Sequence, residues 1–493
     1  MMTNLRVLAC MLLLFCVCVA QGQDEDDPFK RYEAFRRQAV KRYDNFREEA
    51  NRKYGQFQEE AWKRFSATPA VPKPKDEEVP PVTIPDDEVE RDKEESKPVV
   101  IREVVTPPAP EPQPVPVSPI EETPVPTPSY SAFTFYGTDC RVRTGNSTAI
   151  TLGDCSNDKL TAAWGLLADG SYDNTIIDLL ALRKDMQLSD WAYLNMINTY
   201  AESILGRGNE ATFLTAFIYC QSGYRMRIGR DRNKLCLLFA SKYEIYELAY
   251  FVIDGVNYYP YRSAMGSMEI YDMPYPKEKA MSLLITTEQL FTYDATAERT
   301  LTSERYPDMS VTLSVNKNTI DFFDSYPSSS VDNDFMTRWA MYADTPLDEK
   351  VRETLYPVVE RCTAGLSQQD AANKIINWVQ TAFVYEYDNK VWGHDRAFFA
   401  EETLYYPYCD CEDRAILFSH LIRDIIGLDV LLVYYPGHLA TAVAFTENVD
   451  GDYITFEGRN YTICDPTFIG APVGWTMTGM DNSSVRVCRL SRH

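Results

Sequence analysis

Three residues in the last fifth of the chain can together perform thiol chemistry: Cys411, His438 and Asp465. A cysteine at a helix N-terminus meets partial positive charge and free backbone N–H groups, which lower the pKa of the thiol and can hold an oxyanion. A neighbouring histidine can take and return the proton, and a carboxylate can fix the tautomer of that histidine. Such a set is typical of acyl transfer through a cysteine nucleophile.

The apolar pattern around these residues predicts the elements that position them. Helices are expected over 369–383 and from Cys411 to the helix stop Gly427, and strands over 429–434, 439–445 and 460–464. Cys411 then begins a buried helix, His438 begins the second strand, and Asp465 follows the third. A helix packed on this sheet can therefore bring the three side chains together.

The same stretch resembles a known family. FFAEETLYYPYCDCEDRAILFSHLIRDIIGLDVLLVYYPGHLATAV, followed by YTICDPTFIGAPVG, is similar to the transglutaminase-like superfamily, in particular its bacterial members. The family motif has a cysteine before Glu-Asp at a helix start, a histidine that opens a strand and an aspartate before proline. The resemblance covers roughly residues 369–475. It implies an α+β, papain-like core with Cys411, His438 and Asp465 as catalytic triad, no cofactor, and activity as a peptidase, amidase or acyltransferase, although some members are inactive.

The C-x-C pair leaves a choice of nucleophile. The Asp-Cys-Glu-Asp pattern of the family selects Cys411, which also lies closer to the helix than Cys409 and gains more from its dipole. Cys409 could instead form a disulfide with Cys464. An alternative interpretation joins Cys409, Cys411, His438 and Cys464 in a site for a soft metal such as zinc.

Other polar and aromatic residues nearby have weaker claims. His420 falls on the helix and is expected to pack or face solvent, and His394 lies in a polar loop, could line a cleft and receives no role. Trp392 and the three tyrosines Tyr405, Tyr406 and Tyr408 could wall a cleft, donate to an oxyanion, or simply pack.

The preceding region, residues 131–262, is predicted to be a second copy of the same fold without the catalytic residues. It shows helix, helix, strand, strand, turn and strand in the same order as the C-terminal region, 351–493. When Gly223 is placed on Gly427, Arg207 falls at the position of Cys411; Arg262 falls at that of Asp465 when the later strands are matched. The alternative is an unrelated α+β domain. Residues 263–350, with the alternating runs MSVTLSV and TIDFFDSY, are expected to bridge the copies with strands.

The sequence of residues 1–130 does not have the pattern of a globular domain. Residues 1–22 have the layout of a cleavable secretory signal. Residues 23–66 contain an eleven-residue repeat that aligns Tyr32, Phe35 and Ala39 with Tyr54, Phe57 and Ala61 along one helix stripe. Over 30–65 this segment carries 11 basic and 6 acidic residues. The helix is expected to self-associate, bind an anionic surface or pack on another protein, or to be a solvated spacer.

Residues 67–130 are expected to form an acidic, proline-rich linker. The stretch 66–130 holds 17 of the 29 prolines, with 14 acidic and 6 basic residues. Proline at this density blocks helices and sheet ladders and favours extended segments. The linker should therefore tether the folded part at a distance from the N-terminal helix.

Composition narrows the class of protein. The chain has 493 residues and a formal net charge of −23, which argues against a general nucleic-acid binder. Its 45% of hydrophobic residues can fill a large core, and no apolar run is long enough for a membrane-spanning helix. Export is expected, to the periplasm or the extracellular space, where the protein could be associated with the cell surface.

Nine cysteines remain after the signal, an odd number that suggests one free thiol. Cys140 and Cys155 could close a short loop, or several of the cysteines could simply be buried without a disulfide. The alternative to an enzyme is a non-catalytic protein that binds peptide or cell-wall material through the same fold.

Overall fold

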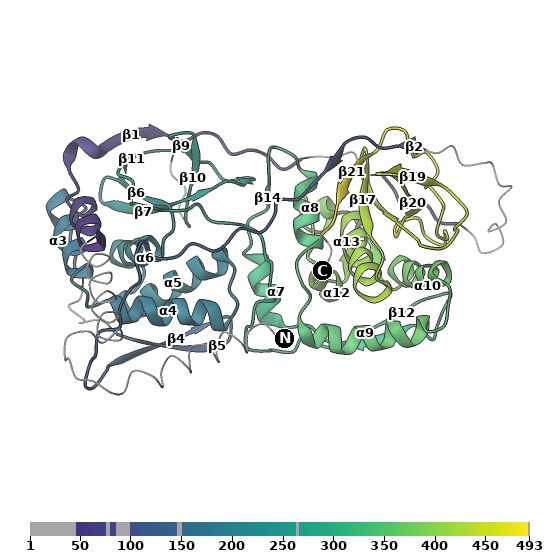
Figure 1. Cartoon of the computed structure of the whole chain (residues 1–493), viewed down its shortest axis with the longest axis horizontal. Helices are drawn as coiled ribbons and strands as arrows, with labels where there is room; N and C mark the ends of the chain where they lie inside the picture. Colours follow the sequence, from purple (N-terminus) through teal and green to yellow (C-terminus); the bar gives the residue numbers. More distant parts are fainter. Residues whose placement is uncertain (1–45, 75–78, 85–98, 145–149, 263–265, 492–493) are drawn as a thin grey trace, which may run out of the picture.

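The structure is a computed structural model that describes residues 46–74, 79–84, 99–144, 150–262 and 266–491. The predicted signal peptide, 1–22, and residues 23–45 of the predicted helix lie outside these ranges. The fold is mixed α+β, with two halves side by side, each a sheet packed against helices (Figure 1). No helix in the described part of the chain is long and apolar enough to cross a membrane.

The first half contains a six-stranded sheet whose neighbouring strands are all antiparallel. Its strands, in spatial order, are β1 (Trp62–Ser66), β11 (Ser267–Tyr271), β6 (Met226–Asp231), β7 (Lys234–Ser241), β10 (Val256–Pro260) and β9 (Phe251–Ile253). Its helices are α3 (Asn157–Leu167), α4 (Asp173–Asp185), α5 (Asp190–Leu205) and α6 (Asn209–Gln221), and a hairpin of β4 (Tyr130–Phe135) and β5 (Thr138–Arg143) lies beside them. The deeply buried helices α5 and α6 form the centre of this half.

The second half contains a seven-stranded sheet. Its strands, in spatial order, are β2 (Val99–Val100), β19 (Tyr453–Phe456), β20 (Arg459–Cys464), β18 (His438–Val443), β17 (Val430–Tyr435), β21 (Arg486–Arg489) and β3 (Val104–Val105). Its helices are α9 (Glu349–Thr363), α10 (Gln368–Thr381), α11 (Asp388–Val391), α12 (Ala400–Tyr405) and α13 (Cys411–Leu421), which η3 (Ile422–Ile426) continues. The helices and strands predicted around Cys411, His438 and Asp465 are all present.

Helix α13 is the central helix of the second half. All eleven of its residues are buried, and it packs against β18, α8 (Met336–Ala343), α10 and α12. Its continuation ends at Gly427, which has a positive φ of 76°. A glycine adopts this left-handed conformation without steric cost, so the chain can turn there into β17.

The region between the halves differs from the predicted strand-rich bridge. MSVTLSV contributes β13 (Ser310–Leu313), which pairs with β12 (Arg299–Thr302), but TIDFFDSY lies mostly in α7 (Lys317–Asp324). Asn316 caps α7 by accepting a hydrogen bond from the backbone of Asn318. The buried residues of α7 are Thr319, Ile320, Phe322 and Phe323, a spacing that suits one helix face as well as it suits a strand. A further short pair, β8 (Glu244–Ile245) with β14 (Ser329–Ser330), links the first half to this region.

The predicted long N-terminal helix ends earlier than expected. Within the described residues it covers 46–54, and the chain then passes through η1 (Glu59–Ala61) into β1. The stripe residues Tyr54 and Phe57 are 1% and 0% exposed, because they pack against Trp164 and Tyr271 of the first half. Over residues 50–61 the stripe is therefore part of the chain's own core and not a free surface for another partner, whereas Phe46 remains 40% exposed.

The predicted detached linker also differs from the structure. We call the described residues between 67 and 129 the strap, since they run along both halves of the molecule (Figure 1). The strap supplies β2 and β3 to the second sheet, and its Val99, Ile101 and Val104 cover an apolar cluster on that sheet. Val79, Val82 and Ile84 cover another cluster around Phe468. Proline-rich sequence blocks regular ladders but not short edge pairings or apolar contacts, and these hold the strap.

The strap then returns to the first half. Arg183 donates to the carbonyl of Pro114, and the backbone of Val115 passes so close to Gly223 that a Cβ atom at this position would lie 2.0 Å from the Val115 oxygen. Gly223 also has a positive φ of 96°. The glycine that ends α6 is therefore required twice, for its conformation and for the close approach of the strap.

None of the described cysteines forms a disulfide, and all of them are buried. The disulfides expected for Cys140 with Cys155 and for Cys409 with Cys464 are not formed in this structure. Each of these side chains instead occupies an apolar position, as small buried thiols commonly do.

Candidate functional site

The start of α13 is held in place by its own side chains and by α10. Asp410 caps the helix by accepting from the backbone of Asp413, and the Asp413 carboxylate accepts from the backbone N–H of Asp410 at 3.2 Å. The buried guanidinium of Arg414 donates to the carbonyls of Gln380 and Phe383 at 3.1 and 2.8 Å. Cys411, the first residue of the helix, is therefore fixed relative to α10.

His438 and Asp465 form a buried pair at one end of two neighbouring interior strands of the sheet, β18 and β20. His438 opens β18 opposite Tyr435, across the turn that contains Gly437, and Asp465 directly follows β20. The Nε2 atom of His438 lies 2.8 Å from Oδ2 of Asp465. The other ring nitrogen, Nδ1, is buried and has no hydrogen-bond partner. The pair thus holds the imidazole by one nitrogen and leaves the other available.

Gln380 on α10 positions the loop that carries Asp465. Its amide nitrogen donates to the carbonyls of Asp465, Phe468 and Ala471 at 3.1, 2.7 and 3.1 Å. Its own backbone carbonyl accepts from Arg414, as described above. One residue therefore connects the cysteine end of α13 to the aspartate loop. Sequence reasoning missed it, because nothing in the helix pattern distinguishes a buried glutamine from an exposed one.

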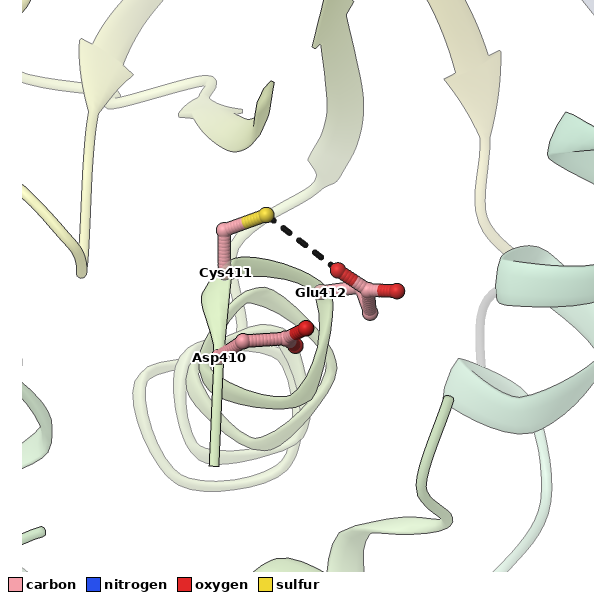
Figure 2. Close-up of side chains that lie close together, drawn as sticks. All are labelled: Asp410, Cys411 and Glu412. Atoms are coloured by element: carbon pink, nitrogen blue, oxygen red, sulfur yellow. Dashed lines mark hydrogen bonds between the residues drawn. The ribbon is translucent and has the colours of Figure 1, made fainter. Parts of the chain in front are cut away.

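Cys411 is a buried, neutral thiol in this structure. Its Sγ donates to Oε2 of Glu412 at 3.2 Å, as Figure 2 shows, and the backbone N–H of Leu439 donates to the sulfur. Burial, and then the carboxylates of Glu412 and Asp410, raise the pKa of Cys411 well above its ordinary value. The expectation that the helix N-terminus would lower this pKa is therefore wrong for this state, because desolvation and two adjacent carboxylates outweigh the helix dipole.

Cys411 and His438 line the same cavity, of about 350 Å³. The wall is formed by four aromatic side chains and by several acidic ones, from α11 and its following loop, the start of α13, the β17–β18 turn and the strap. The lining residues used below are Lys73, Glu247, Tyr385, Asp388, His394, Asp395, Asp410 and Glu412. The thiol thus has access to a chamber rather than to open surface.

Two of the acidic groups come from the loop between α10 and α13. Asp395 forms an ion pair with the buried guanidinium of Arg338 from α8. Asp388 accepts from the backbone of Arg396, and burial together with the Glu412 carboxylate raises its pKa to about 8. Oxygen atoms of Asp388, Asp395 and Glu412 lie within 4.8 Å of one another. Sequence reasoning missed this cluster, although the acidic residues beside Cys411 were visible in its motif.

The remaining sequence-predicted residues occupy other places. The thiol of Cys409 is buried and accepts from Arg414 at 3.5 Å, outside the cavity lining. In the described part of the chain, the groups whose ligand atoms cluster are Asp410–Cys411–Glu412 and Asp388–Asp395–Glu412, so the Cys409, His438 and Cys464 set is not assembled as a metal site.

Nearby aromatic residues differ in part from expectation, whereas the two histidines lie where the sequence allowed. The cavity is lined by Tyr385 and Tyr387, whereas Trp392 and Tyr406 pack against Phe398. His394, to which the sequence assigned no role, lines the cavity, and His420 is buried within α13.

The first half reproduces the frame of the site without its side chains. In both halves the sheet order is the same: β9–β10–β7–β6–β11 corresponds to β19–β20–β18–β17–β21. The hairpin pair Asp231 and Lys234 matches Tyr435 and His438, so Lys234 replaces the histidine. Arg262 follows β10 as Asp465 follows β20, and Arg207 lies exposed before α6.

The chain matches no family model, no curated protein and no solved structure. The function must therefore be argued from the site itself.

Proposed function

We propose that the chain is an exported, transglutaminase-like cysteine hydrolase or acyltransferase that acts on peptide or amide bonds through Cys411, His438 and Asp465. The observation that carries this proposal is the buried 2.8 Å contact of His438 Nε2 with Asp465, which leaves Nδ1 of a cavity-lining histidine without a partner. The third member, Cys411, lines the same cavity from a helix N-terminus. A papain-like core with this chemistry has the same three parts: a helix-borne thiol, a strand-borne histidine and a carboxylate.

The proposed reaction begins when His438 accepts the thiol proton and the Cys411 sulfur attacks the amide carbonyl carbon. The oxyanion of the tetrahedral intermediate is held by the backbone N–H of Cys411, which as a first-turn donor has no intrahelical acceptor. His438 then protonates the departing amine, and a thioester remains. Water or a second amine resolves the thioester, which distinguishes hydrolysis from acyl transfer. Asp465 orients the imidazole and stays ionised.

Substrate binding must change the resting state. Cys411 donates to Glu412, and its pKa is raised, so the thiolate is scarce before substrate arrives. A substrate that displaces or neutralises the Glu412 carboxylate would remove the main charge that opposes ionisation. The proton can then pass to His438, and the nucleophile forms where the substrate is already bound.

One observation favours the alternative, a non-catalytic protein that binds peptide or cell-wall material. The thiol hydrogen bond goes to Glu412 rather than to His438, as it would in a site that no longer uses its cysteine as a nucleophile. The two functions differ in the reactivity of one atom, the Cys411 sulfur.

A thiol-labelling experiment separates them, with Cys362 as an internal control. Cys362 and Cys411 are equally exposed, at 8% each, but Cys362 donates to the carbonyl of Asp308 and lies outside the cavity. The reduced protein is treated with a short peptide that carries an iodoacetamide group, so that the probe occupies the cavity as a substrate would, and the labelled peptides are identified by mass spectrometry. An enzyme labels at Cys411 in preference to Cys362, and His438→Ala slows labelling of Cys411 alone.

Two results would contradict the proposed function. Equal labelling of Cys362 and Cys411 shows that exposure alone sets the rate, which supports the binding protein. Labelling of Cys409 in place of Cys411 shows that the nucleophile is wrongly assigned, whereas Cys409→Ser is expected to leave labelling of Cys411 unchanged.

A further inference from the structure

The cavity around Cys411 is strongly acidic. Its lining includes five carboxylates and a single lysine: Glu247, Asp388, Asp395, Asp410 and Glu412 against Lys73. Arg338 balances one of them, Asp395, from behind the wall. Burial, and then the Glu412 carboxylate, raises the pKa of Asp388 to about 8 and that of Asp410 well above its ordinary value, so these two groups hold protons near pH 7 in this state. A cation that enters the chamber favours their ionised forms, and burial strengthens this attraction because little water screens it.

Three buried side-chain atoms of lining residues have no hydrogen-bond partner: Nε1 of Trp339, Oδ1 of Asp410 and Nδ1 of His438. Asp410 is 8% exposed and His438 is 1% exposed. Buried polar atoms are normally hydrogen-bonded, so an orphaned carboxylate oxygen in a chamber wall indicates a place for a donor from a ligand. Asp410 stands directly before Cys411, and the two residues lie together in Figure 2.

The fold itself places an ammonium group at this chamber. Lys73, in the Pro72-Lys73-Pro74 part of the strap, lines the cavity, and its Nζ donates to the backbone carbonyl of Asp395. Glu247 lies 3.9 Å from the same nitrogen. The attraction of Asp395, Glu247 and Asp388 for this ammonium is opposed by burial, which lowers the pKa of Lys73. A short extended peptide with a central lysine is thus already seated against the acidic wall.

We infer that this cavity binds extended peptides that carry a cationic side chain next to the reacting amide, with Asp388, Asp395 and Glu412 as the recognition subsite. The inference rests on the proposed function, since it names the substrate class of the same cavity. Lys73 brings an ammonium group to the same chamber, where it contacts Glu247 and the backbone carbonyl of Asp395, and it must leave when a substrate enters. The cation also neutralises the carboxylates that oppose ionisation of Cys411, so binding and activation of the nucleophile are coupled.

A divalent metal ion is the competing occupant of three clustered carboxylates. Magnesium and calcium require six or more oxygen ligands, several of them charged. Here Asp395 is already engaged by the Arg338 guanidinium, whose positive charge repels a metal ion. An ammonium or guanidinium group needs only two or three acceptors and tolerates this arrangement better.

The test measures peptide binding to the full-length Cys411→Ala protein, which cannot turn the peptide over. Three fluorescent hexapeptides are compared by anisotropy, identical except for a central lysine, norleucine or glutamate. The lysine peptide is expected to bind at least about tenfold more tightly than the norleucine peptide, and the glutamate peptide more weakly than both. The preference should decline as salt is raised.

Two further variants place the effect in the subsite. Asp388→Asn keeps an oxygen to accept from Arg396 and is expected to reduce the lysine preference to within about threefold. Lys73→Met removes the internal ammonium and is expected to tighten binding of the lysine peptide several-fold. Asp158→Asn, on α3 of the first half, is the matched control and should change nothing. Thermal melting verifies that each variant is folded, and Lys73→Met tests the inference even where Asp388→Asn does not fold.

The outcomes separate this inference from the proposed function. Equal binding of the lysine and norleucine peptides overturns the inference, even where Cys411 labels as an enzyme would. A lysine preference in a protein whose Cys411 does not label supports the cation subsite but indicates that it serves a non-catalytic peptide-binding protein. Stabilisation by millimolar calcium or magnesium that Asp388→Asn abolishes, without a lysine preference, assigns the cluster to a metal and overturns the inference.

Discussion

The two halves of the molecule share a sheet order, but the cavity of about 350 Å³ that contains the candidate site belongs to the second. In the first half a three-residue turn, 206–208, joins α5 to α6; in the second, residues 382–410 join α10 to α13. The long connection carries Asp388, His394 and Asp395, which line the cavity. The same arrangement of a helix and two hairpins therefore occurs both with and without the candidate site. The two halves differ in the long loop before α13 and in the side chains at the positions of Cys411, His438 and Asp465.

The side chains at corresponding positions explain why the first half should be inert. Lys234 and Arg262 replace His438 and Asp465 in the strand register, and Arg207 lies before α6. Arg207 and Arg262 both approach Glu202 on α5, at 3.5 and 4.0 Å. These cations form exposed ion pairs, which are weak contributors to stability and cannot act as a nucleophile or a neutral base at physiological pH. The first half is expected to be structural.

The largest expected difference between the two halves is the effect of removing the Cys411 sulfur on catalytic rate. Cys411→Ala is expected to reduce hydrolysis of a peptide amide to background, a loss of about ten-thousandfold or more, because no other group can form the thioester. Arg207→Ala, at the corresponding position of the first half, should leave the rate unchanged. Release of a chromogenic amine from a lysine-containing peptide anilide measures both. Equal losses in the two variants would place chemistry in both halves.

A second change tests how far the first half depends on the N-terminal repeat. Phe57→Ala is expected to lower the free energy of unfolding by about 3–5 kcal/mol, since Phe57 is fully buried and contacts Tyr271 and Phe213. Phe46 occupies the preceding repeat position and is 40% exposed, so Phe46→Ala should change it by at most about 0.5 kcal/mol. Urea unfolding of both variants provides the measurement. A small change in the free energy of unfolding for Phe57→Ala would contradict the packing of the repeat into the core and would support a free surface helix.

The third change separates the positioning carboxylate from its counterpart. Asp465→Asn is expected to lower turnover about a hundredfold or more, because the amide no longer stabilises the imidazolium or selects its tautomer. Its Oδ1 can still accept from the backbone of Thr467 and Phe468, at 2.8 and 3.2 Å, so the loop should remain folded. Arg262→Asn should have no effect. A pH–rate profile that Asp465→Asn leaves unchanged would assign Asp465 a purely structural role.

The smallest expected effect is a gain. Glu412→Gln removes the nearest charge that raises the pKa of Cys411, so the pKa should fall and the thiolate fraction at pH 7 should rise. Alkylation of Cys411 is expected to become about three- to tenfold faster at pH 7, with a pH profile displaced to lower pH. Glu353→Gln, on the exposed face of α9, is the control. Slower alkylation in Glu412→Gln would instead make Glu412 a base for the thiol.

Local pattern was sufficient for most of the second half. The spacing of apolar residues predicted α10, α13 and the strands β17, β18 and β20, because each buries one regular face or is buried throughout. The same reasoning failed for α7, whose apolar residues fit both periods, and for residues 55–66, where the helical repeat continues in sequence but the chain forms η1 and β1. There the tertiary gain from burying Phe57 and adding a strand outweighs helix propensity.

The amino-acid sequence by itself determined the order of elements, the helix stop at Gly427, where the continuation of α13 ends, and the identity of Cys411, His438 and Asp465 as residues that could meet. Only the tertiary structure decided that the thiol donates to Glu412, that Asp388 and Asp395 converge beside it and that Lys73 of the strap reaches their chamber. The physical reason is the distance along the chain over which each property is determined. Apolar periodicity is a local property of ten or twenty residues, whereas charge clustering and burial depend on segments more than three hundred residues apart, such as Lys73 and Asp395.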